Sequence, residues 1–170
     1  MRIEPLRRED AAAVVAAEDE LTVRWLSGGH STVAGTAEYI LRLDRAAEQG
    51  RPKRAFGIRL DDRCVGTIDV DPEVADGLDP GDVNIAYGVA PWVRGRGVAV
   101  RAVELVCAVI RDRGLGTRAV IRADSRNPAS SRVAEKAGFR LLRVVHSSTE
   151  SQEDGRPVVL QVYGRDLPRG

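Results

Sequence analysis

The sequence has few of the residue types on which several protein classes depend. Its 170 residues include two cysteines, two histidines, one methionine and few aromatic side chains. Cys64 and Cys107 lie far apart in apolar segments, which argues against a disulfide framework and predicts two small buried side chains. His30 and His146 are isolated from each other and from the cysteines, so we expect no metal site.

Long apolar runs and a strong charge imbalance are also missing. No run reaches the length that spans a membrane, and residues 1–4 show no signal-peptide pattern, so we expect a cytoplasmic protein without membrane association. The 26 basic and 25 acidic residues nearly cancel. Nucleic-acid binding through Arg94, Arg96 and Arg101 is disfavoured for this reason and because aromatic residues are few.

The residues that are present favour one globular domain over positions 1–170. Apolar residues make up 43% of the chain and charged residues 30%, which is a balance typical of a folded protein. Hydrophobic periodicity and turn signals place strands between helices, an order that predicts an α+β fold with one sheet and helices on its faces. The expected strands are 2–7, 54–60, 64–70, 83–89, 117–123, 139–145 and 157–163, and the expected helices are 9–19, 32–49, 98–113 and 128–138.

Two segments near the end of the chain carry further expectations. Residues 147–156 are polar, which predicts a mobile loop between the last two strands. Residues 157–163 are expected to form an edge strand, which would be able to pair across a dimer axis. The sequence does not decide between a monomer and a homodimer.

The most informative segment is the turn between the strand at 83–89 and the helix that begins at Val98. It contains Arg94, Gly95, Arg96 and Gly97, followed by Val98 and Ala99. Glycines let the backbone approach a ligand closely, and a helix start offers unpaired N–H groups and the positive end of the helix dipole. These features predict an anion site that suits a phosphorylated ligand.

Two motifs together resemble the GNAT N-acetyltransferases. Arg94-x-x-Gly97-x-Ala99 is similar to the R/Q-x-x-G-x-G/A signature of that family, which follows its fourth strand. Downstream, residues 127–139 contain Asn127, Ser130 and Val133, and continue with Glu135-Lys136-x-Gly138-Phe139. This spacing resembles the branch of the family that acetylates ribosomal-protein N-termini. The resemblance is good over residues 83–145, whereas residues 1–82 match only in element order.

This resemblance implies acetyl-coenzyme A as the donor and a primary amine as the acceptor. It also implies a central, mixed but mostly antiparallel twisted sheet, splayed between its fourth and fifth strands, with helices on both faces. The pantetheine arm would lie in the gap, and backbone groups of the fourth strand and the side chain of Asn127 would bind it. Phosphates would bind at the turn and the helix start. The implied donor-site residues are Tyr87, Gly88, Val89, Arg94, Gly95, Arg96, Gly97, Val98, Ala99, Asn127 and Ser130.

The resemblance also suggests which groups carry the chemistry. A backbone amide near Val89 would stabilise the oxyanion on the thioester carbonyl. Many members protonate the departing thiolate with a tyrosine seven residues after the asparagine, but that position is Ala134 here. Ser130 stands where the ribosomal-protein branch carries a serine donor, and Ser131 is the alternative.

The general base is left open by the sequence. The position at which the ribosomal-protein branch often carries a glutamate corresponds to Asn84, which cannot accept a proton. Asp82, Asp69 and Asp71 lie near strand ends and are candidates to act through water; of these we favour Asp82. A further alternative is that the enzyme uses no general base and that positioning of the two substrates is sufficient.

The acceptor amine is not identified by the sequence. Trp25, His30 and Tyr39 are candidates for the wall of its pocket. The leading interpretation is an enzyme that acetylates a protein N-terminus or a small-molecule amine. An aminoglycoside-type antibiotic acetyltransferase and a non-catalytic acyl-CoA sensor on the same scaffold are the alternatives.

Overall fold

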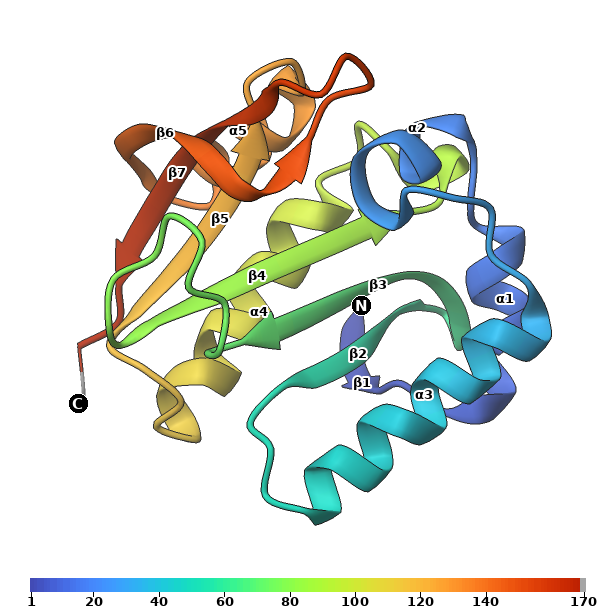
Figure 1. Ribbon diagram of the computed structural model, residues 1–170. Coiled ribbons are helices and arrows are strands. Elements are labelled where there is room, and N and C mark those ends of the chain that lie inside the picture. Colours follow the sequence, from blue (N-terminus) through green and yellow to red (C-terminus); the bar gives the residue numbers. More distant parts are fainter. Residues whose placement is uncertain (169–170) are drawn as a thin grey trace.

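A seven-stranded sheet forms the centre of the molecule, in the order β1-β2-β3-β4-β5-β7-β6 (Figure 1). The structure is a computed structural model, and it describes residues 1–168. The strands are β1 Arg2–Pro5, β2 Arg54–Leu60, β3 Arg63–Asp71, β4 Asp82–Val89, β5 Arg118–Asp124, β6 Arg140–Ser151 and β7 Pro157–Asp166.

The sheet is split between its two central strands. β4 and β5 are parallel, whereas every other neighbouring pair is antiparallel. Their pairing covers Asp82 to Asn84 against Arg118 to Val120, and beyond Asn84 the two strands diverge (Figure 1). The predicted splayed sheet is confirmed.

Helices cover both faces of the sheet. The helix α1 packs on β3 and α3 on β2, while α4 packs on β1, β3 and β4 from the opposite face and α5 contacts α4, β5 and β7 (Figure 1). The α+β fold with helices on both faces is therefore confirmed. The helical elements are η1 Arg8–Asp10, α1 Ala11–Ala16, α2 Glu20–Thr22, η2 Val23–Ser27, α3 Val33–Glu48, η3 Pro91–Val93, α4 Val98–Asp112 and α5 Pro128–Lys136.

The core lies mainly between α4 and the sheet. Val103, Val106 and Ile110 of α4 are completely buried and belong to one cluster with Ile68 and Val70 of β3. Their spacing of three and four residues places them on one helix face. Both cysteines are buried free thiols, as predicted, and burial raises the pKa of the Cys107 thiol to about 11.

The helix expected over residues 9–19 is wrong in length. It divides into the η1 turn and the short α1, which ends at Ala16. Asp19 is the N-cap of α2 instead, because its carboxylate accepts a hydrogen bond from the Thr22 backbone N–H at 3.0 Å. An N-cap residue has extended backbone angles, and this conformation interrupts the first helix. The new helix continues as the π-helical η2 and ends at Gly28, whose φ is 70°.

Two expectations near the end of the chain are also corrected. The loop expected at residues 147–156 is shorter, since β6 runs to Ser151 and the buried Ser147 hydroxyl donates to Asp76 at 2.6 Å. The strand expected at the edge is internal, because β7 lies between β5 and β6. Its hydrogen-bonding groups are used on both sides, so β1 and β6 form the sheet edges instead.

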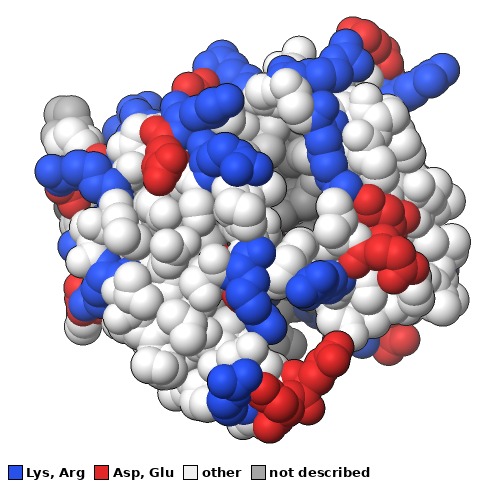
Figure 2. Space-filling view, turned by 90° about the horizontal axis from the view of Figure 1, so that it is seen from above, with Lys and Arg blue, Asp and Glu red and all other residues white. Residues whose placement is uncertain are grey.

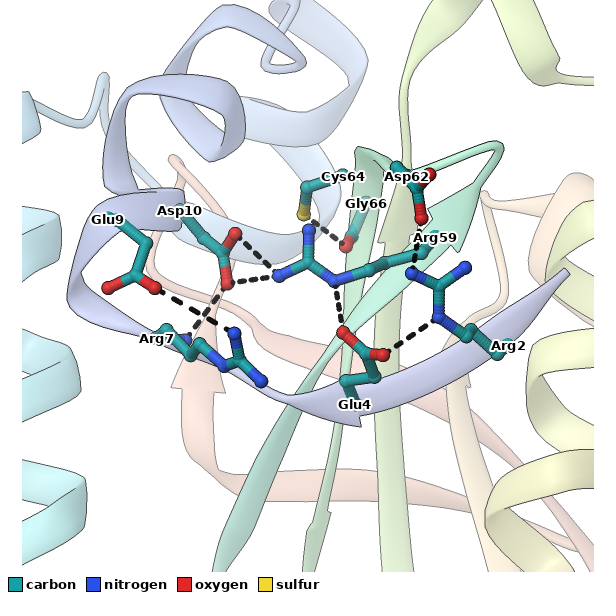
Figure 3. Close-up of polar contacts among 9 residues, drawn as sticks. All are labelled: Arg2, Glu4, Arg7, Glu9, Asp10, Arg59, Asp62, Cys64 and Gly66. Atoms are coloured by element: carbon teal, nitrogen blue, oxygen red, sulfur yellow. Dashed lines mark hydrogen bonds and ion pairs between the residues drawn. The ribbon is translucent and has the colours of Figure 1, made fainter.

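A buried ion pair attaches the beginning of the chain to the sheet. The Arg59 guanidinium of β2 contacts the Asp10 carboxylate at 2.7 and 2.9 Å, and also approaches Glu4 of β1 (Figure 3). The Asp10 carboxylate in addition accepts from the backbone N–H of Arg7 at 3.0 Å. These contacts fix the entry to α1, and with it the face of the sheet that α1 and α3 cover.

Candidate active site

The split in the sheet opens into a cleft of about 1060 Å³. Its floor is the unpaired half of β4, and its walls come from the turn before α4, the start of α5 and the η2 segment. The predicted donor-site residues that line it are Tyr87, Gly88, Val89, Arg94, Gly95, Gly97, Val98, Ala99, Asn127 and Ser130. The exposed Arg96 is not among the lining residues.

Backbone groups of β4 face this cleft. The Ala90 N–H donates to the Val65 carbonyl at 2.8 Å, so alternate residues back along β4 direct their N–H and C=O groups towards β3. The intervening residues Tyr87 and Val89 direct theirs towards β5. Because β5 does not pair with β4 beyond Asn84, the strand presents free donors and acceptors to anything that enters the split.

The turn before α4 has the backbone expected of an anion site. Gly95 and Gly97 have φ values of 72° and 78°, in the left-handed region that favours glycine. The first helical hydrogen bond runs from the Arg101 N–H to the Gly97 carbonyl. The N–H groups of Val98, Ala99 and Val100 therefore lack a helical carbonyl and lie at the positive end of the helix dipole.

The role expected for the Arg94 side chain needs correction. Its guanidinium donates to both oxygens of Asp19, at 2.6 and 2.8 Å, to the Thr22 hydroxyl and to the Val89 carbonyl. These hydrogen bonds lower the pKa of Asp19 strongly. Arg94 thus joins the turn to α2 and to the end of β4 and, with its charge paired, is a weaker phosphate ligand than the sequence suggested.

Ser130 meets Tyr87 across the cleft. The Tyr87 hydroxyl lies 3.1 Å from the Ser130 Oγ and 3.3 Å from its carbonyl oxygen. Burial raises the pKa of Tyr87 to about 12, although the contact with Ser130 opposes the rise. The phenol therefore stays protonated at neutral pH and is able to donate to Ser130.

Asn127 is the N-cap of α5. Its side-chain oxygen accepts from the Ser130 N–H at 3.3 Å, which leaves the side-chain NH₂ group available to a ligand in the cleft. The alternative donor, Ser131, points elsewhere, because its hydroxyl donates to Gln161 of β7 at 2.9 Å.

A second pocket, of about 740 Å³, opens on the α1 and α3 face of the sheet. His30 and Tyr39 line it, as expected for the acceptor wall. Trp25 does not: it lines the donor cleft, with its ring 4.5 Å from the Arg24 guanidinium carbon and 5.9 Å from that of Arg126. The π-helical turn of η2, absent from the prediction, directs this side chain to the other side.

The two cavities meet along β4. Residues that line both come from the end of β4, from the α2–η2 segment and from β5; they are Thr22, Leu26, Asn84, Ala86, Gly88, Val89 and Arg122. A ligand in the split and a ligand in the second pocket would thus contact the same stretch of strand from two sides.

Asp82 lies away from both cavities, so the structure does not support it as the general base. Its buried carboxylate accepts from the Arg118 guanidinium at 2.7 and 3.0 Å, at the end of β4 where the strands still pair. It lines neither cavity. Asp69 and Asp71, by contrast, line the second pocket.

Basic side chains surround the opening of the donor cleft. Figure 2, a view from above, shows Lys and Arg on both sides of a hollow in this face. Basic residues that line the cleft include Arg24, Arg126, Arg132 and Lys136. Local positive charge of this kind attracts a phosphorylated ligand although the chain as a whole is nearly neutral.

Sequence reasoning missed three features of the site. They are the Asp19–Arg94 pair, the Tyr87 hydroxyl beside Ser130, and the ammonium group of Lys53 between two carboxylates of β3. Asp19 followed three residues later by Thr22 is a recognisable N-cap pattern, whereas the other two carry no local signal. Within residues 1–168 no cluster of His, Cys, Asp and Glu is suited to a metal ion, and no helix has the length and apolarity to cross a membrane.

Solved structures share this fold over nearly the whole chain. A ribosomal L7/L12 α-N-protein acetyltransferase, RimL, in complex with coenzyme A is 16% identical, with a TM-score of 0.81 over 99% of this chain and 94% of that one. An aminoglycoside acetyltransferase, AAC(6')-Ib, in complex with coenzyme A is 19% identical, with a TM-score of 0.77 over 96% and 93%. A ribosomal-protein-S5-alanine acetyltransferase from Vibrio fischeri is 15% identical, with a TM-score of 0.78 over 97% and 92%.

At these identities the structural likeness establishes the fold. No curated protein sequence matches the chain. The family model described as "Acetyltransferase (GNAT) domain", however, matches residues 1–140. This match covers both the turn at the start of α4 and the Asn127–Ser130 segment, and it shows that the chain belongs to the GNAT acetyltransferase family.

Proposed function

We propose that this acetyltransferase moves the acetyl group of acetyl-coenzyme A to a primary amine by direct attack, with both substrates bound. The observation that carries the proposal is the meeting of two cavities along β4. A donor in the split and an amine in the second pocket would approach each other at Gly88 and Val89. Holding two reactants in this way supplies a large part of the rate acceleration by itself.

The residues present fit coenzyme A. The N–H and C=O groups of Tyr87 and the N–H of Val89, whose carbonyl accepts from Arg94, suit the amide groups of pantetheine, which pairs with a strand edge as another strand would. The N–H groups at the start of α4 suit the pyrophosphate. The Asn127 side chain is placed to bind the pantetheine from the opposite wall of the cleft.

Three groups of this chain would carry the chemistry. The Val89 N–H would stabilise negative charge on the thioester oxygen. The Ser130 hydroxyl would donate its proton to the departing thiolate and would be re-protonated by Tyr87, whose hydroxyl lies 3.1 Å away. The acceptor would lie against His30 and Tyr39.

The acceptor class is a protein N-terminus or a small-molecule amine. The similar structures include a ribosomal-protein N-terminal acetyltransferase and an aminoglycoside acetyltransferase. The second pocket carries three carboxylates, from Glu18, Asp69 and Asp71, against the cations of Lys53 and Arg122. This excess of negative charge favours a cationic acceptor.

The test is release of free thiol from acetyl-coenzyme A across small amines, aminoglycosides and N-terminal peptides, with wild type and Ser130→Ala. We expect turnover with at least one amine class and a kcat about 100-fold lower in the variant. Full turnover by Ser130→Ala at saturating substrate would contradict the serine assignment. Tight binding of acetyl-coenzyme A without thiol release for any amine would favour an acyl-CoA sensor.

Donor binding has a separate test in Gly97→Glu, measured by calorimetry. The new carboxylate would repel phosphates at the start of α4, and we expect acetyl-coenzyme A affinity to fall at least about 10-fold, or roughly 1.4 kcal/mol. Gly114→Glu is the matched control, because Gly114 also has a positive φ and open space but lies beyond the other end of α4. Equal affinities in the two variants would contradict phosphate binding at this turn.

A further inference from the structure

A compact cluster of charges lies in the acceptor pocket, outside the donor machinery described above. The Lys53 ammonium lies 3.3 Å from an Asp69 carboxylate oxygen and 3.4 Å from one of Asp71. Tyr39 of α3 lies beside Lys53. One ammonium faces two carboxylates, so the cluster carries an excess negative charge in a half-buried place.

Asp69 is placed on the face of the sheet that an acceptor would use. On β3, Thr67, Asp69 and Asp71 alternate with the buried Ile68 and Val70, and all three line the acceptor pocket. In the register of the two strands, Asp69 lies opposite Ala86 of β4, and Thr67 opposite Gly88.

This register gives the distance along the sheet. Asp69 is therefore a diagonal neighbour of Gly88, at a separation of roughly 7–8 Å, which leaves room for one water between its carboxylate and an amine bound at Gly88. A carboxylate that acts through one water is within the reach of a general base.

The other candidate carboxylates are engaged elsewhere. Asp82 is bound by Arg118, and Asp19 by Arg94. Glu18 accepts hydrogen bonds from Ser27 and Ser31 that lower its pKa despite some burial.

Asp71 and Asp69 differ in how strongly hydrogen-bond donors hold their carboxylates. One Asp71 oxygen accepts from the Glu73 N–H at 2.9 Å and holds the loop after β3. For Asp69, burial raises the pKa, and the Lys53 charge opposes only part of the rise. A carboxylate with a raised pKa is a better proton acceptor than one bound by several donors.

We infer that Asp69 is the general base of the reaction, taking a proton from the acceptor ammonium through one water, while Lys53 positions its carboxylate. This inference rests on the proposed function. The ammonium loses one proton to Asp69, and the amine lone pair forms the new C–N bond with the thioester carbon. When the C–S bond breaks, the thiolate takes a proton from Ser130. The second amine proton replaces it on the Ser130–Tyr87 pair through solvent, and Asp69 releases the first proton to solvent, so that amide, free thiol and one proton result.

The test compares Asp69→Asn, Asp69→Glu and Asp71→Asn with wild type, using thiol release for kcat and KM and calorimetry for acetyl-coenzyme A binding. In Asp69→Asn we expect kcat to fall at least about 100-fold while the acetyl-coenzyme A affinity stays within about twofold. Asp69→Glu keeps a carboxylate and should recover at least a tenth of the wild-type kcat. Asp71→Asn removes one negative charge from the acceptor pocket, so the KM for the amine should rise, but the base is intact and kcat should stay within about threefold of wild type.

The pH profile separates a base from a structural role. The charged or titratable groups around Asp69 are Lys53, Asp71 and Tyr39, and Glu18, His30 and Arg122 line the same pocket. In Asp69→Asn, kcat/KM should keep rising with pH up to the pKa of the amine, because solution must remove the proton, whereas the wild-type profile levels off earlier.

Two outcomes would overturn the inference in different ways. An Asp69→Asn variant with wild-type kcat and an unchanged pH profile would remove the role of Asp69 and leave the proposed function intact. A wild-type protein that binds acetyl-coenzyme A but releases no thiol with any amine would overturn both the proposed function and the role of Asp69.

Discussion

Arg94 and Asp19, 75 residues apart in the chain, are joined by two hydrogen bonds of 2.6 and 2.8 Å. One belongs to the turn that forms the donor site and the other is the N-cap of α2. The segment that follows Asp19 carries Thr22 and Leu26, which line both cavities. This pair therefore sets the position of the acceptor wall relative to the donor turn.

The first prediction concerns this pair. Asp19→Asn keeps a residue that caps helices well but removes the charge that Arg94 binds. We expect KM for the amine to rise about three- to tenfold, because the α2–η2 segment loses its attachment to Arg94. A tenfold rise corresponds to roughly 1.4 kcal/mol of binding free energy. Steady-state kinetics would check this, with Glu38→Gln on the exposed face of α3 as control. A KM within the range of the control would show that the pair does not position the segment.

The second prediction concerns the Tyr87–Ser130 contact. Tyr87→Phe removes the hydroxyl beside Ser130 and keeps the ring, so kcat should fall about 10-fold, or roughly 1.4 kcal/mol of barrier, with KM little changed. If the two hydroxyls act in series, adding Tyr87→Phe to Ser130→Ala should cost nothing further. Tyr163→Phe, at a buried core tyrosine, is the matched control. Additive losses in the double variant would contradict a shared proton path.

A third prediction concerns stability, at the ion pair that holds the beginning of the chain. Asp10→Ala leaves the Arg59 guanidinium, only 10% exposed, without its main partner. Removing one member of a buried pair costs about 3–5 kcal/mol. Urea unfolding should show this loss, whereas Glu9→Ala, at a side chain 73% exposed, should change the unfolding free energy by less than about 0.5 kcal/mol. Similar losses in both variants would mean that the pair contributes nothing beyond local helix structure.

The fourth prediction concerns acid stability. Burial by itself would raise the pKa of Asp76, but donors from Ser147, Ser148 and Thr149 outweigh it and lower the pKa to about 2. Because the folded pKa lies below the ordinary value, this carboxylate stabilises the fold above about pH 4 and loses that contribution as the pH falls towards 2. The loss amounts to about 2 kcal/mol at most.

Urea midpoints between pH 5 and pH 2 would check this. Asp76→Asn should be less stable than wild type at pH 5, and the difference should shrink towards pH 2. The exposed Asp44 of α3 offers a control, since its substitution by Asn should leave the slope of the profile close to that of wild type. A difference between Asp76→Asn and wild type that stays constant with pH would contradict the prediction.

Much of the fold was predictable because local patterns repeat at the right period. The buried residues of α4 recur every three or four positions, and β3 alternates between buried and half-buried side chains. The end of the first helix was missed because a capping carboxylate, rather than a glycine or proline, interrupts it at Asp19. The internal position of β7 was missed because strand order depends on long-range pairing, which local pattern does not encode.

The donor site was predictable for a similar reason. Its anion-binding turn is a short contiguous segment, Arg94 to Ala99, in which glycine conformation and a helix start act locally. The acceptor side was not predictable in this way, because its side chains come from separate elements, α3, β3, β4 and the η2 turn. Trp25, in the π-helical turn, lines the donor cleft and not the expected acceptor wall.

The family of this protein, its α+β fold and the turn at the start of α4 can be read from the sequence, since each depends on local spacing. The use of its charged side chains depends instead on how the chain packs. Packing pairs Arg94 with Asp19 and Asp82 with Arg118, and it leaves Asp69 facing the acceptor pocket with Lys53. The reason is physical: a charge acts on whatever group packing brings within a few ångströms, and that neighbour is often distant in the chain.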